Sequence, residues 1–193
     1  MEKQKNTLPI AARWQDFPDI ELYMDQVISV LEKHLVPYFP DEKCITPTMI
    51  NNYVKQRLIL PPQNKRYAKG QLTRLFMICI LKSFMQLSDI RLLLENLSLS
   101  RTDEELFDLF AAELDGSVKW VIEHITPEKD HDAPTEKVLR ASLNAFASIV
   151  FARIEFRRAA EDFVPLAEEE EKSEKKEKKD KKEEKKKEKR EKK

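Results

Sequence analysis

Glycine is nearly absent from this sequence, at two of 193 residues. Glycine-rich loops that cradle phosphate groups need several glycines at fixed spacing, so this class of nucleotide site is excluded. Cysteine is equally scarce, and Cys44 and Cys79 are too few and too far apart for a disulfide framework. We therefore expect a cytoplasmic protein, in a compartment that keeps thiols reduced.

Long apolar runs are also missing. The longest, residues 75–81, is far too short to cross a bilayer. The first seven residues are polar and no apolar signal segment follows them. These features predict a protein that is neither exported nor inserted into a membrane.

Motifs for metal binding and catalysis are not recognisable. The histidines and cysteines lack the paired spacing of a metal site, and the many carboxylates form no nameable pair with a nucleophile. The scattered candidate ligands are His34, Cys44, Cys79, His124 and His131. We therefore expect no metal, no cofactor and no enzymatic activity.

Carboxylates are absent from residues 43–88, although the rest of the chain before its tail is strongly acidic. A stretch that is basic throughout, within an acidic chain, favours a surface that meets a polyanion, although chance variation of charge along the sequence is the alternative. The eight basic residues are Lys43, Lys55, Arg57, Lys65, Arg66, Lys69, Arg74 and Lys82.

Apolar residues recur at helical spacing along most of the chain, which predicts a mainly α fold. We expect helices over residues 18–39, 46–57, 69–85, 88–97, 102–114 and 135–163, with a bend or an end at Gly116 and further helix over 118–125. Ser88 is the expected cap of the fourth helix. The one expected β element is a two-stranded wing around residues 58–67. Four regions follow: a flexible N-terminus (1–15), a winged helix-turn-helix domain (16–100), a helical dimerisation or effector region (101–165) and a Lys/Glu-rich tail (166–193).

The tail has no apolar side chain from residue 168 to residue 193, where 14 basic and 11 acidic residues alternate. Such a segment has no apolar surface to offset the entropy of ordering, so it cannot join a core. We expect it to be disordered or a solvated helix that keeps the protein soluble.

The predicted helix from Thr46 has two distinct faces. Ile50, Tyr53 and Val54 share one face, which would pack on the domain. The other face carries hydroxyl, amide and ammonium groups, which suit base edges and phosphates in a DNA major groove. Its residues are Thr48, Asn51, Asn52 and Lys55. Any surface helix has a polar face, so this pattern gains weight only from its surroundings.

The order of segments supplies those surroundings. Residues 45–62, ITPTMINNYVKQRLILPP, resemble the recognition helix of the MerR superfamily and its proline-containing approach to the wing. Lys65-Arg66-Tyr67 resembles the end of that wing, and the apolar residues from Leu72 to Leu94 resemble its two closing helices. More specifically, residues 14–23 and 46–53 resemble an uncharacterised family of Gram-positive bacteria, domain of unknown function 1836.

The resemblance to the MerR superfamily, which covers residues 12–100, implies a transcriptional regulator that binds double-stranded DNA. It matches Tyr53 to the aromatic residue of the recognition helix, Lys65 to the wing's phosphate contact and Tyr67 to the tyrosine that closes the wing. Arg66 would grip phosphate beside Lys65. The two tyrosines are equally well explained as core residues.

The chain departs from the MerR pattern at three positions of the predicted recognition helix and in the turn after Tyr67, which lacks the usual acidic residue. Asn51 stands where an arginine is usual, Asn52 where a tyrosine is usual, and Arg57 where the superfamily has glycine. The first two changes put the usual operator geometry in doubt. An outward Arg57 would restore a phosphate contact.

The C-terminal half carries an apolar band, which is expected to be covered. The band comprises Leu139, Leu143, Phe146, Ile149, Val150 and Phe151. It forms either a homodimer interface, as is typical of MerR-like proteins, or an intramolecular core. Its partners in such a core would be Leu106, Phe107, Phe110, Leu114, Trp120 and Val121. An alternative function follows: a helical module that keeps the helix-turn-helix shape but binds a protein partner. No effector is identifiable from the sequence.

Overall fold

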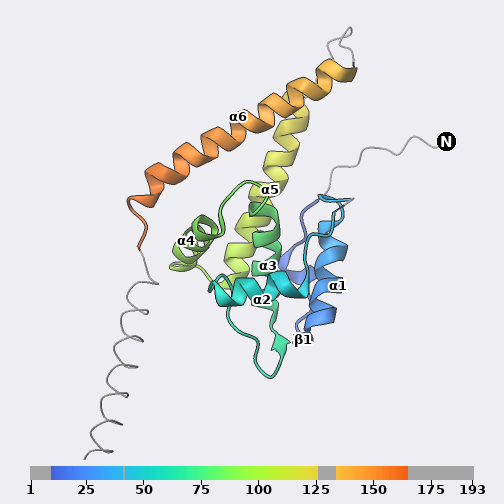
Figure 1. Cartoon of the computed structure of the whole chain (residues 1–193), viewed down its shortest axis with the longest axis vertical. Coiled ribbons are helices and arrows are strands. Elements are labelled where there is room, and N and C mark those ends of the chain that lie inside the picture. Colours follow the sequence, from blue (N-terminus) through green and yellow to red (C-terminus); the bar gives the residue numbers. More distant parts are fainter. Residues whose placement is uncertain (1–9, 41, 126–133, 165–193) are drawn as a thin grey trace, which may run out of the picture.

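The computed structural model describes residues 10–40, 42–125 and 134–164, and within these ranges the protein is mainly α-helical, as the sequence predicts (Figure 1). The helices are η1 (Trp14–Asp16, 3-10), α1 (Met24–Leu35), α2 (Pro47–Lys55), α3 (Lys69–Leu81), α4 (Leu87–Ser98), α5 (Asp103–Ile125) and α6 (Pro134–Ala160). Two short strands, β1 (Leu22–Tyr23) and β2 (Arg66–Tyr67), pair antiparallel.

The core is organised around α3, which packs against both α1 and α5. Helix α3 is apolar on most of its surface, so it is buried on more than one side. At its centre the Phe76 ring meets the rings of Phe17, Phe107 and Phe110 edge-on, at centroid distances of 6.2, 5.7 and 6.4 Å. Such edge-to-face pairs add about 0.5–1.5 kcal/mol each beyond area burial.

Helix α1 is shorter than predicted at both ends. Residues 22–23 form β1 instead of helix, and the Tyr23 amide donates to the Gln26 side chain (2.9 Å), which starts the helix at Met24. At the other end the helix stops at Leu35 and residues 36–38 form a turn that contains Pro37. Strand pairing and proline therefore overrode the apolar periodicity that had predicted a helix over 18–39.

Helix α2 begins as predicted. The Met49 amide donates to Thr46 Oγ1 (3.2 Å), and Pro47 occupies the first turn, where its missing N–H costs nothing. The helix ends at Lys55, two residues before the predicted end, and Arg57 adopts a left-handed backbone with φ of 59°. The Leu58 amide then donates to the Tyr53 carbonyl (2.9 Å), which is the hydrogen bond of a Schellman cap. Glycine is favoured at such a position, and this chain places Arg57 there.

The predicted wing differs in its strand pairing. Gln63 and Arg66 exchange both backbone hydrogen bonds (3.0 and 2.8 Å) around Asn64 and Lys65, whose φ angles of 48° and 64° define a tight turn of type I′. Beyond the single bridge between Gln63 and Arg66, however, β2 pairs with β1 and not with residues 58–62. Pro61 and Pro62 lack N–H groups, so that side of the turn cannot supply donors to a longer ladder.

The predicted boundaries at residues 15 and 100 do not divide the structure. Ala11 and Ala12 are buried, and the Ala11 amide donates to Asp115 Oδ1 of α5 (2.7 Å), so residues 10–15 are docked; residues 1–9 lie outside the described chain. At the other boundary, Leu106 and Phe107 of α5 belong to the same core as α3. A segment that looked like a second region therefore completes the first.

Two further helix predictions were wrong. Gln86, not Ser88, is the N-cap of α4. Helix α5 continues through Gly116, because one exposed glycine costs a helix only about 1 kcal/mol.

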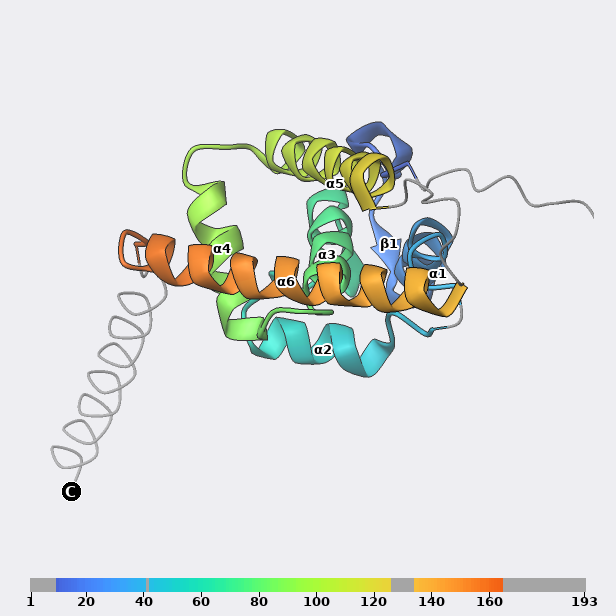
Figure 2. The same ribbon diagram turned by 90° about the horizontal axis from the view of Figure 1, so that it is seen from above.

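Helix α6 crosses one side of the body, as Figures 1 and 2 both show. The body is the part of the chain that shares the core, from η1 to the start of α5. It starts one residue earlier and ends three residues earlier than predicted. After it, the Asn96 side chain of α4 donates to the Val164 carbonyl (3.2 Å) and accepts from the Val164 amide (2.8 Å). This pair of bonds fixes the end of the C-terminal segment to α4. The predicted tail lies outside the described residues.

Candidate nucleic-acid interface

The two faces of α2 separate as the sequence predicts. Ile50 and Tyr53 lie in the core, at 0 and 3% exposure. The opposite face consists entirely of exposed residues, namely Thr48, Asn51, Asn52 and Lys55. Helix α2 lies at the edge of the body in Figure 2, so its exposed face is accessible to a large ligand.

The turn after α2 adds a second exposed element. Asn64, Lys65 and Arg66 are all exposed. Arg66 is partly engaged, since its guanidinium lies 5.0 Å from the centre of the Tyr23 ring and donates to the Tyr23 hydroxyl (3.1 Å). This hydrogen bond raises the pKa of Arg66 above its usual value, so the group stays charged. A guanidinium has five donors, so Arg66 retains donors for a phosphate.

Tyr53 and Tyr67 are core residues, which is the second of the two explanations considered for them. They are 3 and 2% exposed, and burial raises the pKa of both, that of Tyr53 to about 12. In this conformation neither ring is available for the DNA contact that the resemblance implied for Tyr53. Their position instead fastens α2 and β2 to the body.

Three of the eight basic residues in the carboxylate-free stretch are only partly exposed and are held by contacts within the protein. Lys69 forms an ion pair with Asp19 (2.8 Å) and lies over the Trp14 ring. Arg74 donates to the Leu58 carbonyl (2.8 Å) and Lys82 to the Cys44 carbonyl (2.5 Å). Burial lowers the pKa of Arg74, as expected of a guanidinium enclosed by protein.

The remaining five basic residues are exposed: Lys43, Lys55, Arg57, Lys65 and Arg66. The charge count along the sequence therefore overstated the basic surface, because it could not separate cations that are partly buried by contacts within the protein from cations that are exposed to solvent. The carboxylate-free character of this stretch is unchanged by that correction.

Two features of this surface had no clear sequence signal. The connection between α1 and α2 runs from residue 36 to residue 46, whereas the turn of a helix-turn-helix has about 3–4 residues. It brings Lys43 to the surface ahead of α2. Tyr23, the partner of Arg66, lies 43 residues earlier in the chain, and only the pairing of β1 with β2 brings them together. The prolines at 37 and 40 were the available hint of the long connection.

The potential metal ligands do not gather. Within residues 10–40, 42–125 and 134–164, no group of three or more His, Cys, Asp or Glu side chains is arranged to hold a metal ion. Cys44 and Cys79 are buried free thiols, and burial raises the pKa of both, that of Cys79 to about 12. None of the helices in the described part of the chain combines the length and apolarity needed to cross a membrane.

Comparison with known proteins identifies one family. The model of a domain of unknown function, DUF1836, matches residues 12–112, just over half of the chain, from the buried Ala12 into α5. No curated protein and no solved structure matches the sequence. The matched range ends beyond Phe107, so it agrees with a core that includes the start of α5. The chain therefore belongs to the DUF1836 family.

Proposed function

We propose that this protein is a DNA-binding transcriptional regulator that inserts α2 into the major groove and holds phosphate with the turn at residues 63–66. The observation that carries the proposal is the exposed surface of α2 and this turn. It presents hydroxyl, amide and ammonium groups and comes from a stretch without a single carboxylate. The resemblance of residues 45–67 to a MerR-like recognition helix and wing supports the same assignment.

Each exposed side chain has a role in this proposal. Asn51 and Asn52 carry amides, which pair in a bidentate manner with adenine in the major groove, and the Thr48 hydroxyl pairs with either kind of base edge. Lys55 and Lys65 neutralise phosphates, a contribution that does not depend on sequence and weakens with salt. Arg57 and Arg66 add further phosphate contacts at the corner after α2 and at the end of the turn.

The protein would bind as a homodimer through α6. Of the six residues in the predicted apolar band only Ile149 is half-buried, and the others are exposed, Phe146 at 63%. The intramolecular core proposed as the alternative does not cover this band, because Leu106, Phe107 and Phe110 pack on the α3 side instead.

The spacing of the exposed apolar side chains supports a second copy as the cover. The exposed large apolar side chains of α6 each leave more than one third of their surface exposed, as is common at interaction surfaces. They are Val138, Leu139, Leu143, Phe146, Val150, Phe151 and Ile154. Leu139, Leu143, Phe146 and Val150 follow the 4-3-4 spacing of helices that pair side by side. The turn at 63–66 and α6 lie on different sides of the body (Figures 1 and 2), so the dimer leaves the DNA surface open.

Fluorescence anisotropy tests DNA binding by the full chain. The probes are a duplex from the region upstream of the protein's own gene and a scrambled duplex, at several salt concentrations. Asn51→Ala should cost about 1–3 kcal/mol on the specific site alone, and Lys65→Gly should weaken both duplexes and lower the salt slope by about 1. Lys119→Ala, which removes an exposed cation at the far end of α5, is the matched control. Flat titrations of both duplexes at low salt would overturn the proposal.

Sedimentation tests the dimer separately. Phe146→Glu should convert the dimer to a monomer at micromolar concentration, whereas Ser148→Glu, which adds the same charge on the opposite side of α6, should leave it intact. Circular dichroism of both variants checks that α6 remains folded.

The exposed face of α6 also keeps the alternative function in view, a helical module that binds a protein partner. A wild-type chain that stays monomeric at tens of micromolar and binds neither duplex would favour it. Binding of that partner would then be unaffected by Lys65→Gly and abolished by Phe146→Glu.

A further inference from the structure

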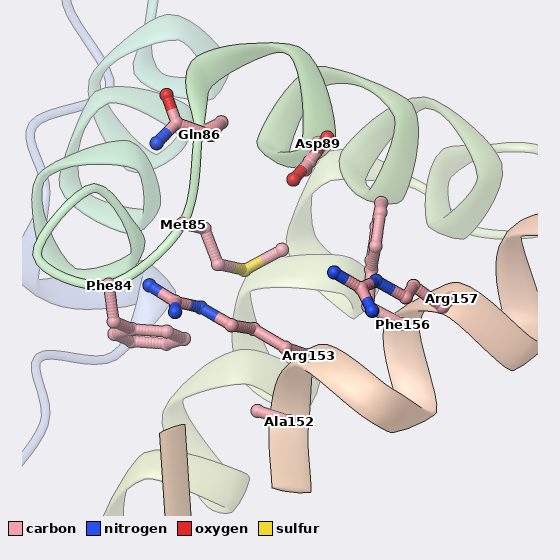
Figure 3. A pocket seen from close by; sticks show the side chains of 8 residues that line it. All are labelled: Phe84, Met85, Gln86, Asp89, Ala152, Arg153, Phe156 and Arg157. Carbon is pink, nitrogen blue, oxygen red and sulfur yellow. The ribbon is translucent and has the colours of Figure 1, made fainter. Parts of the chain in front are cut away.

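A cavity of about 460 Å³ lies between the turn that joins α3 to α4 and the C-terminal half of α6 (Figure 3). Its volume is within the range of about 300–1,000 Å³ that is common for small-molecule sites. Its lining comprises Phe84, Met85, Gln86, Asp89, Ala152, Arg153, Phe156 and Arg157.

The lining combines an apolar surface with two cations. Phe84, Met85 and Phe156 are half-buried, so part of each side chain faces the cavity. Arg153 and Arg157 are four residues apart, which places them on one side of α6. In the view of Figure 3, Arg153 extends toward Phe84, while Arg157 and Phe156 lie at the other end of the cavity.

These two guanidiniums differ from those of Arg158 on α6 and Arg91 on α4. Arg158 forms an ion pair with Glu155 (2.5 Å), and Arg91 with Glu95 (2.8 Å). Among the residues that the structure describes, Arg153 and Arg157 form neither an ion pair nor a hydrogen bond. Asp89 accepts a hydrogen bond from the Ser88 hydroxyl (3.2 Å) and lowers the cavity's charge to a net +1. The cavity therefore has unused donors for an anion.

The wall on α6 is held in place against α4. The Phe156 ring packs edge-on against Phe163 (5.9 Å, 68°), and the two hydrogen bonds between Asn96 and Val164 fix the chain that follows. These contacts restrain the backbone of this wall, which reduces the entropy cost of binding.

We propose that this cavity binds a small organic anion with an apolar body, a carboxylate or a phosphate ester. A guanidinium at either end of the cavity can hold such a headgroup by charge-assisted, bidentate hydrogen bonds, and the apolar body lies against Phe84, Met85 and Phe156. This site goes beyond the proposed DNA binding and does not depend on it.

Isothermal titration calorimetry on the full chain tests the proposal with four probes: octanoate, octyl phosphate, 1-octanol and inorganic phosphate. At least one of the two amphiphilic anions should bind ten or more times more tightly than 1-octanol and than inorganic phosphate. The tighter of the two anions identifies the headgroup as carboxylate or phosphate. Equal binding of 1-octanol would overturn the proposal, because it would show that the site selects an apolar chain and not an anion. The absence of binding by both anions at millimolar concentration would overturn it too.

Variants locate the site. Arg153→Ala with Arg157→Ala should weaken the preferred anion at least tenfold, and Arg158→Ala, the matched control, should leave its affinity unchanged. An unchanged affinity in the double variant, with α6 folded by circular dichroism, would place the anion elsewhere and reject this cavity.

Discussion

The same kind of side chain, phenylalanine, is buried in the core around α3 and exposed on α6. Phe107, in the first part of α5, is fully buried between Phe17 and Phe76, at centroid distances of 5.3 and 5.7 Å. Phe146, in the middle of α6, is 63% exposed. Both lie on helices with apolar faces. An apolar face in the sequence therefore does not show by itself whether the same chain covers it.

The largest expected effect separates these two positions. Phe107→Ala should lower the free energy of unfolding by about 3–5 kcal/mol, because it removes transfer energy and leaves a cavity. Phe146→Ala should change the stability of the monomer by less than about 0.5 kcal/mol. Urea denaturation at a protein concentration low enough to keep the chain monomeric measures the free energy of unfolding of both variants. A similar loss in the two variants would show that α6 is part of the body's core.

A tyrosine in the body should make stability sensitive to alkali. Burial raises the pKa of Tyr53 to about 12 from an ordinary value of 10, so the folded state keeps the proton more firmly than the unfolded state. This contribution is complete below pH 10 and is lost as the pH rises to 12. Tyr53→Phe cannot ionise, so between pH 10 and 12 it should lose about 2–3 kcal/mol less than the parent.

Denaturation at pH 8, 10 and 12 measures that difference. The same variant should keep its affinity for DNA, since the Tyr53 ring is buried. A large loss of DNA affinity would mean that α2 rotates when it binds.

A substitution in the turn at residues 63–66 should stabilise the fold and weaken DNA binding. Lys65→Gly creates Asn-Gly, the preferred pair for a type I′ turn, and should stabilise the fold by about 1 kcal/mol. The same change removes a proposed phosphate contact. Lys55→Ala, which removes a cation from a right-handed helix, should weaken DNA binding without that gain. Thermal unfolding and anisotropy together test this, and an Asn-Gly variant with unchanged DNA affinity would remove Lys65 from the interface.

The smallest expected effect compares the two glycines. A Cβ at Gly116 in α5 would meet no atom within 4 Å, so Gly116→Ala should stabilise the protein by about 0.5–1 kcal/mol. At Gly70 the added Cβ would lie 2.1 Å from Asp103 Oδ2. The Asp103 side chain must move, so Gly70→Ala should gain less. Melting temperatures measure the order of the two, and the reverse order would indicate that α5 is distorted at residue 116.

Local signals along the chain predicted the helices but not all of their ends. Thr46 followed by Pro47 located the start of α2 to the residue, because a side-chain cap and a missing N–H act within one turn. Helical periodicity likewise separated the buried Ile50 from the exposed Asn51. The start of α1 was wrong, since its first residues pair with a strand more than forty positions away.

The sequence predicted the kind of site, a basic surface, but not which residues form it. The absence of carboxylates from residues 43–88 is a property of the sequence, and it identified the stretch. Which cations reach solvent was decided by contacts between distant segments: Lys69 with Asp19, and Lys82 with the Cys44 carbonyl. The cavity at Arg153 had no sequence signal, because its walls come from helices more than sixty residues apart.

By itself, then, the sequence determined the mainly helical class, the faces of α2 and the carboxylate-free stretch, because composition and short-range spacing carry that information. Only the tertiary structure decided that Tyr53 and Tyr67 are core residues, that the start of α5 completes the body and that the apolar face of α6 remains exposed. Each of these depends on which surfaces meet, and burial is a relation between segments that no single segment contains.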